Sequence, residues 1–233
     1  MGPPTLDQVC GVLDIEVFQH RNVLMYREFA FTPIERQICL FHSVRPSYIP
    51  SHEDRALWRT FNTIKFKITG LDFLPDSDDE TIVPQEAIKW IVLGWYESFA
   101  SPERFAIAFK FGNIERDLLQ WLRIPAMNLE DFGCPSFHCI PPAERRAFTE
   151  NVLSCGQHRF AGERANDHCP IRETTFYRNW INLKCVDAND IKTDVSTQND
   201  DDDDDADGDD DVDNCYVVDN NENENTRMEF SWC

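Results

Sequence analysis

Two neighbouring segments near the N-terminus constrain the fold more than any other feature of this sequence. In residues 9–18, apolar side chains alternate with Asp14 and Glu16, which is the two-residue period of a β-strand. Residues 22–32 are typical of a second strand, and only a short polar turn separates the two. Strands joined by so short a turn pair antiparallel. The sequence therefore predicts a hairpin as the first part of a sheet.

Downstream, the hydrophobic period changes and strands begin to alternate with helices. At 61–69, Ile64, Phe66 and Ile68 alternate with polar residues, which predicts a third strand, whereas the apolar residues of 85–99 recur at helical spacing. The other expected elements are an edge strand at 36–42, a helical turn at 57–61, strands at 105–111 and 125–130, and helices at 114–122, 143–154 and 170–183. Strands separated by helices are expected to pair parallel, through right-handed crossovers. This order predicts an α/β fold with a mixed sheet, three antiparallel strands followed by parallel strands, and helices on both faces.

The charge is concentrated at the C-terminal end of the chain. The 233 residues carry a formal net charge of −20. Of this, −16 falls in residues 186–233, which hold 18 acidic and two basic side chains, and −4 falls in residues 1–185. The Asp run at 200–205 cannot bury enough apolar surface to offset the entropy of ordering it. We expect a short disordered lead at 1–8, one domain at 9–185 and a disordered acidic tail from residue 186 onwards.

Composition counts against several classes of protein. Affinity for nucleic-acid phosphates comes mainly from clustered Lys and Arg, so a histone-like binder is disfavoured. No apolar run approaches the ~20 residues of a membrane helix, and the first residues lack the basic region and hydrophobic core expected of a secretory signal. Nine cysteines without the spacing of a disulfide scaffold favour an intracellular protein of the nucleus or cytoplasm. The tail is typical of a solvating segment, but a polyanion also suits binding to basic proteins or mimicry of nucleic acid.

Asp14 and Glu16 are the first residues that could carry chemistry. Two residues apart on a strand, their side chains point to one face about 7 Å apart. Buried carboxylates need compensation, and Mg²⁺ or Mn²⁺ provides it with oxygen ligands. The alternative is that this face of the strand is solvated and the two acids face water.

A second group of candidate residues contains cysteine and histidine. Cys134, Cys155, His158 and Cys169 offer four ligands of the kind that a tetrahedral zinc site uses. Such a site could fix the segment 134–169, which has few apolar residues of its own. Reduced buried or surface thiols are the alternative interpretation.

A third feature opens the last predicted helix, where His168 is followed by Glu173. A histidine and a carboxylate brought back to the first strand could act as general base and metal ligand. The alternative is a histidine near a helix N-terminus followed by a first-turn acid that complements the helix dipole.

Together these features resemble the DEDDh 3′–5′ exonuclease superfamily, which has the RNase H-like fold. The stretch LDIE (13–16) is similar to the first motif, AFKFGNIERDLLQWL (108–122) lies where the second belongs, and HCPIRETTFYRNW (168–180) is similar to the third. The strand and helix order over residues 9–183 is also that of the family. More loosely, the chain resembles uncharacterised proteins of arthropod genomes and of their large DNA viruses that begin with a similar DIE strand.

The resemblance implies removal of nucleotides from nucleic-acid 3′ ends with two Mg²⁺ or Mn²⁺ ions. Its implied metal ligands are Asp14, Glu16 and Glu173, with a further acid at Asp117 or Glu115, and His168 would be the general base. Glu173 stands where the family has Asp, and the acid after Asn113 is ambiguous in register. The sequence is therefore also compatible with a fold retained after activity was lost, as a non-catalytic interaction protein that acts through its acidic tail.

Overall fold

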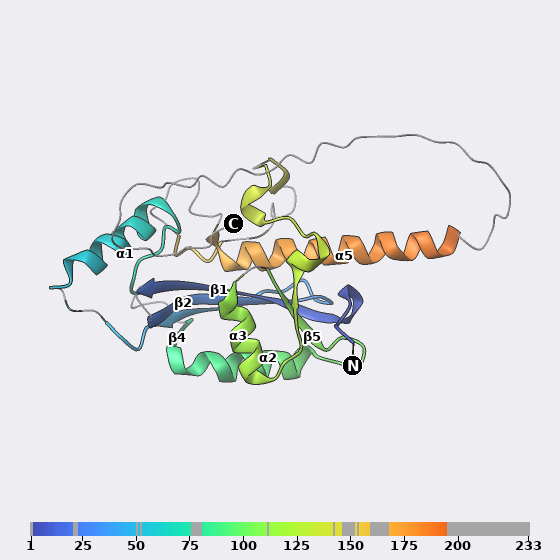
Figure 1. Ribbon diagram of the computed structural model, residues 1–233, viewed down its shortest axis with the longest axis horizontal. Helices are drawn as coiled ribbons and strands as arrows, with labels where there is room; N and C mark the ends of the chain where they lie inside the picture. The colour runs from blue at the N-terminus through green and yellow to red at the C-terminus, as the bar shows by residue number, and fades with distance from the viewer. Residues whose placement is uncertain are drawn as a thin grey trace.

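The structure is a computed structural model that describes residues 2–20, 23–49, 51, 53–75, 81–110, 112–141, 143–145, 152, 154–158 and 168–194. Its centre is a six-stranded mixed sheet in the order β4-β3-β2-β1-β5-β6 (Figure 1). The strands are β1 (Val9–His20), β2 (Val23–Pro33), β3 (Leu40–Arg45), β4 (Ile82–Pro84), β5 (Ala106–Phe109) and β6 (Ala126–Asn128). The first three pair antiparallel, whereas β5 pairs parallel to β1, β6 to β5, and β4 to β3.

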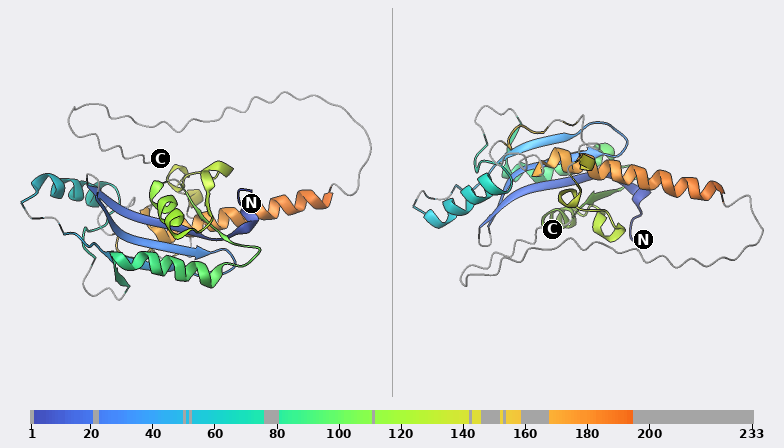
Figure 2. Two further views of the ribbon diagram at one scale, coloured as in Figure 1. Left: turned by 60° about the horizontal axis from the view of Figure 1, so that its bottom comes forward. Right: turned by 90° about the horizontal axis from the view of Figure 1, so that it is seen from above.

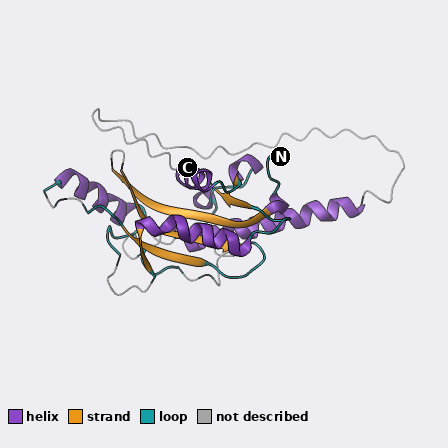
Figure 3. Cartoon of the chain, turned by 90° about the horizontal axis from the view of Figure 1, so that it is seen from below, coloured by secondary structure: helices purple, strands orange, loops and turns teal. Residues whose placement is uncertain are grey.

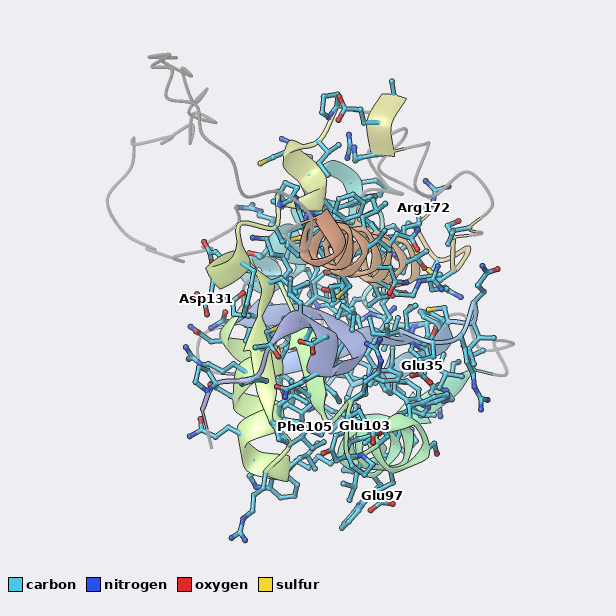
Figure 4. The ribbon with its side chains drawn as sticks, turned by 90° about the vertical axis from the view of Figure 1, so that its right-hand side faces the viewer. Glu35, Glu97, Glu103, Phe105, Asp131 and Arg172 are labelled. Atoms are coloured by element: carbon cyan, nitrogen blue, oxygen red, sulfur yellow. The ribbon has the colours of Figure 1, made fainter. Side chains whose placement is uncertain are left out.

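Helices cover both faces of this sheet. Helix α5 (Pro170–Asp194) lies across one face, and α2 (Ile88–Phe99) and α3 (Asn113–Leu122) pack on the other. Figure 2 shows α5 from above, and Figure 3 shows α2 crossing the strands from below. In Figure 4, Arg172 of α5 and Glu97 of α2 mark the two sides. The predicted mixed α/β sheet with helices on both faces is confirmed at this level.

The period of β1 assigns its residues to the two faces. Leu13 and Ile15 belong to the core cluster beneath α2 and α3, and Val12 belongs to the cluster beneath α5. Successive side chains of a strand point to opposite faces. Asp14 and Glu16 therefore point to the face that carries α5, as the alternation of the sequence predicts.

The strand predicted at 61–69 is wrong, because this segment belongs to α1 (Arg55–Lys67). Leu57, Phe61 and Ile64 are buried at helical spacing, whereas Phe66 is 54% exposed. Ile64, Phe66 and Ile68 alternate with polar residues as they would in a strand, but the helical spacing of buried residues begins earlier, at Leu57. The helix begins after Asp54, whose side chain accepts a hydrogen bond from the Leu57 amide. The third antiparallel strand is instead β3, which overlaps the end of the predicted edge strand at 36–42.

The remaining elements agree with the sequence more closely. The helices predicted at 85–99 and 114–122 correspond to α2 and α3, and the strands predicted at 105–111 and 125–130 to β5 and β6. Of the helix predicted at 143–154, residues 143–145 are helical, 152 and 154 are not, and the others lie outside the described residues. Within the described part of the chain, no helix is long and apolar enough to cross a membrane.

The last helix continues further than its apolar spacing suggests. Helix α5 ends at Asp194, so the first residues after the expected domain boundary at 185 are helical. The rest of the acidic tail, residues 195–233, lies outside the described residues.

Candidate functional site: a carboxylate cluster beside a cysteine and histidine cluster

Three carboxylates meet on the face of the sheet that carries α5. Asp14 and Glu16 come from β1, and Glu173 comes from the first turn of α5, which lies across that strand. One oxygen of each lies within 4.8 Å of the others. The structure therefore brings together the first and third motifs predicted from the sequence, although more than 150 residues separate them in the chain.

A fourth carboxylate, Glu115, joins this group from the first turn of α3. Its Oε1 accepts a hydrogen bond of 3.0 Å from the amide of Ile15, the residue between Asp14 and Glu16. Gly112, which precedes α3 with a φ of 83°, makes this approach possible. A Cβ at that position would lie 2.5 Å from the Glu115 carboxylate, so a larger residue would displace it. We refer to Asp14, Glu16, Glu115 and Glu173 as the carboxylate cluster.

Asp117, the other candidate for the second-motif acid, does not lie in this cluster. Its side chain is 66% exposed and forms an ion pair of 3.3 Å with the adjacent Arg116. Helix α3 buries Glu115, Leu118 and Leu119, so residue 117 falls on the opposite, solvated side of the helix. Of the two acids that the sequence left open, Glu115 has the position of a site residue.

Electrostatic repulsion inside the carboxylate cluster is strong. Burial, together with the charge of Glu173, raises the pKa of Asp14 and of Glu16 well above the usual range of a carboxyl group. Burial also raises the pKa of Glu115, to about 8, even though its hydrogen bonds to backbone amides oppose the shift. The charge of His158 opposes the rise in the pKa of Glu16 without cancelling it. Asp14, Glu16 and Glu115 therefore hold protons at pH values where a surface carboxyl would be ionised.

The cluster also contains polar atoms without hydrogen-bond partners. Among the described residues, Asp14 Oδ2 and Glu16 Oε2 are buried oxygens to which nothing donates. Such atoms are costly unless they are compensated, and a divalent cation compensates several carboxylates at once. The donor set consists only of oxygen, which suits Mg²⁺ or Mn²⁺, so the residues present fit the metal that the sequence predicts.

Two stacked histidines border the carboxylate cluster. The ring of His168 lies 4.3 Å from that of His138, and His138 Nε2 lies 3.4 Å from Glu173 Oε1. Burial and the nearby positive charges of His138, His158 and Arg145 lower the pKa of His168 to about 3. His168 is therefore neutral near pH 7 and can accept a proton. His138 was not predicted as part of the carboxylate site, and its isolated position in the sequence gives no spacing signal for that role.

The predicted zinc quartet is only partly assembled. Ligand atoms of Cys155, His158 and Cys169 lie within 4.8 Å of one another. Cys134 does not lie with them: it is 3% exposed in the core beneath α5, and its thiol donates to the carbonyl of Pro135 at 3.6 Å. The seven cysteines in the described part of the chain are all free thiols.

Glu28, and not Cys134, lies next to Cys155 and His158. Its Oε2 lies 3.3 Å from Cys155 Sγ, and its Oε1 forms an ion pair with His158 Nε2. Burial alone would lower the pKa of His158, but Glu28 and Cys169 outweigh it and raise that pKa to about 11. Glu28 is a single acid within an apolar strand, directly opposite Glu16 across the hairpin. The sequence could have indicated Glu28 as a site residue only through this pairing with Glu16.

Comparison with known proteins gives no family for this chain. No model of a known protein family matches the sequence, and no curated protein matches it. The site therefore has to be interpreted from its own chemistry.

Proposed function

We propose that this protein is a divergent, metal-dependent 3′–5′ exonuclease with an RNase H-like fold. The observation that carries the proposal is the meeting of four carboxylates, from β1, α3 and α5, beside the neutral imidazole of His168. These elements lie far apart in the chain, and a group of buried carboxyls is unfavourable unless something compensates it, as a divalent cation would.

The topology of the sheet supports the same proposal. Strands β3, β2 and β1 are antiparallel, and β5 and β6 follow on the other side of β1 in parallel orientation. This is the order that the resemblance to the DEDDh exonucleases implies. The carboxylates lie where β1 extends past the end of β5, and in open sheets of this kind ligands bind beyond the carboxyl ends of parallel strands.

The carboxylate cluster would hold the metal, with Asp14, Glu16, Glu115 and Glu173 as its oxygen ligands. A pair of Mg²⁺ or Mn²⁺ ions bound there supplies Lewis-acid stabilisation to the attacking and leaving oxygens of a phosphodiester. Glu115 keeps its position through the Ile15 amide, and Glu173 through the helix that begins three residues before it.

His168 would take the proton from the attacking water. Its lowered pKa keeps the imidazole neutral near pH 7, which is the form that accepts a proton. His138 stacks on it and contacts Glu173, which fixes the ring in the site. The guanidinium of Arg145, whose charge acts on His168, is suited to a substrate phosphate.

Incubating the full chain with 5′-labelled single-stranded DNA and RNA in Mn²⁺ tests this proposal. The expected result is stepwise shortening from the 3′ end, with no cleavage of circular single strands. Asp14→Asn should abolish shortening, whereas the matched variant Asp117→Asn should retain it. If folded wild-type protein shortens neither substrate in Mn²⁺ or Mg²⁺, the proposal is wrong. Binding of basic proteins through the acidic tail then becomes the function to test.

A further inference from the structure

A second metal-binding arrangement lies next to the carboxylate cluster and differs from it in chemistry. We propose that Glu28, Cys155, His158 and Cys169 form a zinc centre, with one sulfur each from the two cysteines, one imidazole nitrogen and one carboxylate oxygen. We refer to these four residues as the zinc cluster. The side chains of Glu28 and His158 are 1% and 0% exposed, and Cys169 is fully buried.

The orientation of His158 supports a ligand role. Its Nδ1 donates a hydrogen bond of 2.5 Å to the carbonyl of Thr69, which leaves Nε2 facing Glu28. Histidines that bind metals almost always donate their other ring N–H to a carbonyl or carboxylate in this way. Nε2 is therefore the nitrogen of His158 that is available to a metal, on the side of the ring that faces the Glu28 carboxylate.

The spacing of the four residues also fits. Glu28 contacts both Cys155 and His158, and the amide of Cys155 donates to Cys169 Sγ at 3.4 Å. Ligand atoms of a tetrahedral zinc site lie about 3.3–3.8 Å apart, as Zn–S bonds of about 2.3 Å and Zn–N bonds of about 2.0 Å require. The three cysteine and histidine ligand atoms, within 4.8 Å of one another, need only a small contraction, whereas the Glu28 oxygen that pairs with His158 Nε2 has to move away from it to admit the ion. Zinc binds cysteine as thiolate, and hydrogen bonds with Cys155 and His158 already hold the pKa of Cys169 well below its usual range. Binding would therefore release to solvent the proton of the Cys155 thiol and the proton shared by His158 and Glu28.

The position of the zinc cluster gives it a role in the proposed active site. Cys169 is the residue after His168 and directly precedes α5, which carries Glu173. Glu28 lies opposite Glu16 in the β1–β2 pair. Zinc would therefore join β2, the segment 154–158 and the start of α5, and would act as a positioning centre for His168 without taking part in hydrolysis.

Zinc analysis of the purified full chain tests the proposal. After dialysis against metal-free buffer we expect about one zinc per chain, less than half of it in Cys155→Ser, and an unchanged content in Cys134→Ser, the control for a buried thiol outside the cluster. Glu28→Gln should weaken zinc binding at least tenfold in a competition titration with a chromogenic chelator.

The absorption spectrum of wild-type protein loaded with Co²⁺ is a second test, and it does not depend on whether a variant folds. Co²⁺ should give the near-ultraviolet charge-transfer band of two thiolate ligands and the intense visible bands of a tetrahedral ion. Absence of zinc and of these bands overturns the proposal, as does equal loss of zinc in Cys134→Ser. A wild-type zinc affinity in Glu28→Gln overturns the assignment of the fourth ligand. Asp14→Asn should keep its zinc, so failure of the nuclease proposal and failure of this one are distinguishable.

Discussion

The carboxylate cluster and the zinc cluster lie side by side, and they solve the problem of buried polar groups in opposite ways. In the carboxylate cluster, only oxygen donors face one another, and two buried oxygens have no hydrogen-bond partner among the described residues. In the zinc cluster, Glu28 and His158 satisfy each other as an ion pair, and Cys155 donates to Glu28. The first arrangement needs a hard cation, and the second can persist without metal and offers softer donors. If both proposals hold, the two adjacent sites would discriminate between metals through donor type alone.

The two acids that face each other across the hairpin, Glu16 and Glu28, belong to different clusters, and replacing them one at a time should have the largest effects. Glu16→Gln should reduce Mn²⁺-dependent cleavage by about 10³-fold or more, because it removes a ligand for the cation that stabilises the transition state, and should leave zinc content unchanged. Glu28→Gln should do the reverse, with weaker zinc binding and a smaller loss of cleavage. Rates and zinc content measured on the same preparations check both. Equal loss of zinc in Glu16→Gln would show that the clusters are one site.

A second test concerns the histidine between the two clusters. His168→Gln should lower kcat by about 10²-fold or more, because general-base catalysis is worth that much, while KM and zinc content stay near wild type. His138→Gln should have a smaller effect on kcat, since it acts through the position of His168. Steady-state kinetics on a labelled oligonucleotide separates the two. A larger loss of kcat in His138→Gln than in His168→Gln would show that His138 is the general base and that His168 positions it.

The raised pKa of Glu115 should make the stability of the metal-free protein depend on pH. The folded protein holds the pKa of Glu115 at about 8, above the usual 4.5 of the unfolded chain. The resulting stabilisation is complete below pH 4.5 and disappears as the pH rises through about 8. Metal-free Glu115→Gln should therefore become more stable relative to wild type between pH 5 and pH 8, by about 3–4 kcal/mol. Denaturant unfolding at both pH values measures the difference, and a constant difference would contradict the assigned burial of this carboxylate.

The smallest expected effect belongs to the acid that the sequence placed beside Glu115. Asp117→Asn should change neither cleavage nor zinc content, because the side chain is exposed and its pairing with Arg116 at the surface contributes little to stability. Thermal unfolding and the cleavage assay can be run in parallel with Glu115→Gln. A loss of cleavage in Asp117→Asn that exceeds the loss in Glu115→Gln would reverse the choice between the two acids.

Much of this arrangement could be predicted from local patterns, and the failures at the site share one cause. The alternation around Asp14 and Glu16 correctly placed both acids on one face. The acid of α3 could not be chosen, since Glu115 and Asp117 are only two residues apart and helix burial decides between them. Cys134 was grouped with the zinc ligands through its chemistry alone, but the core beneath α5 holds it elsewhere. Glu28 becomes visible only when the hairpin register sets it opposite Glu16. Partners fixed by tertiary packing are the ones that sequence patterns miss.

The central claim is that two neighbouring sites bind different metals. Anomalous diffraction from crystals of the full chain grown with both Zn²⁺ and Mn²⁺, recorded at the absorption edges of zinc and manganese, tests it directly. We predict zinc between Glu28, Cys155, His158 and Cys169, and manganese between Asp14, Glu16, Glu115 and Glu173. Both metals in one cluster, or neither metal in the carboxylate cluster, would contradict it.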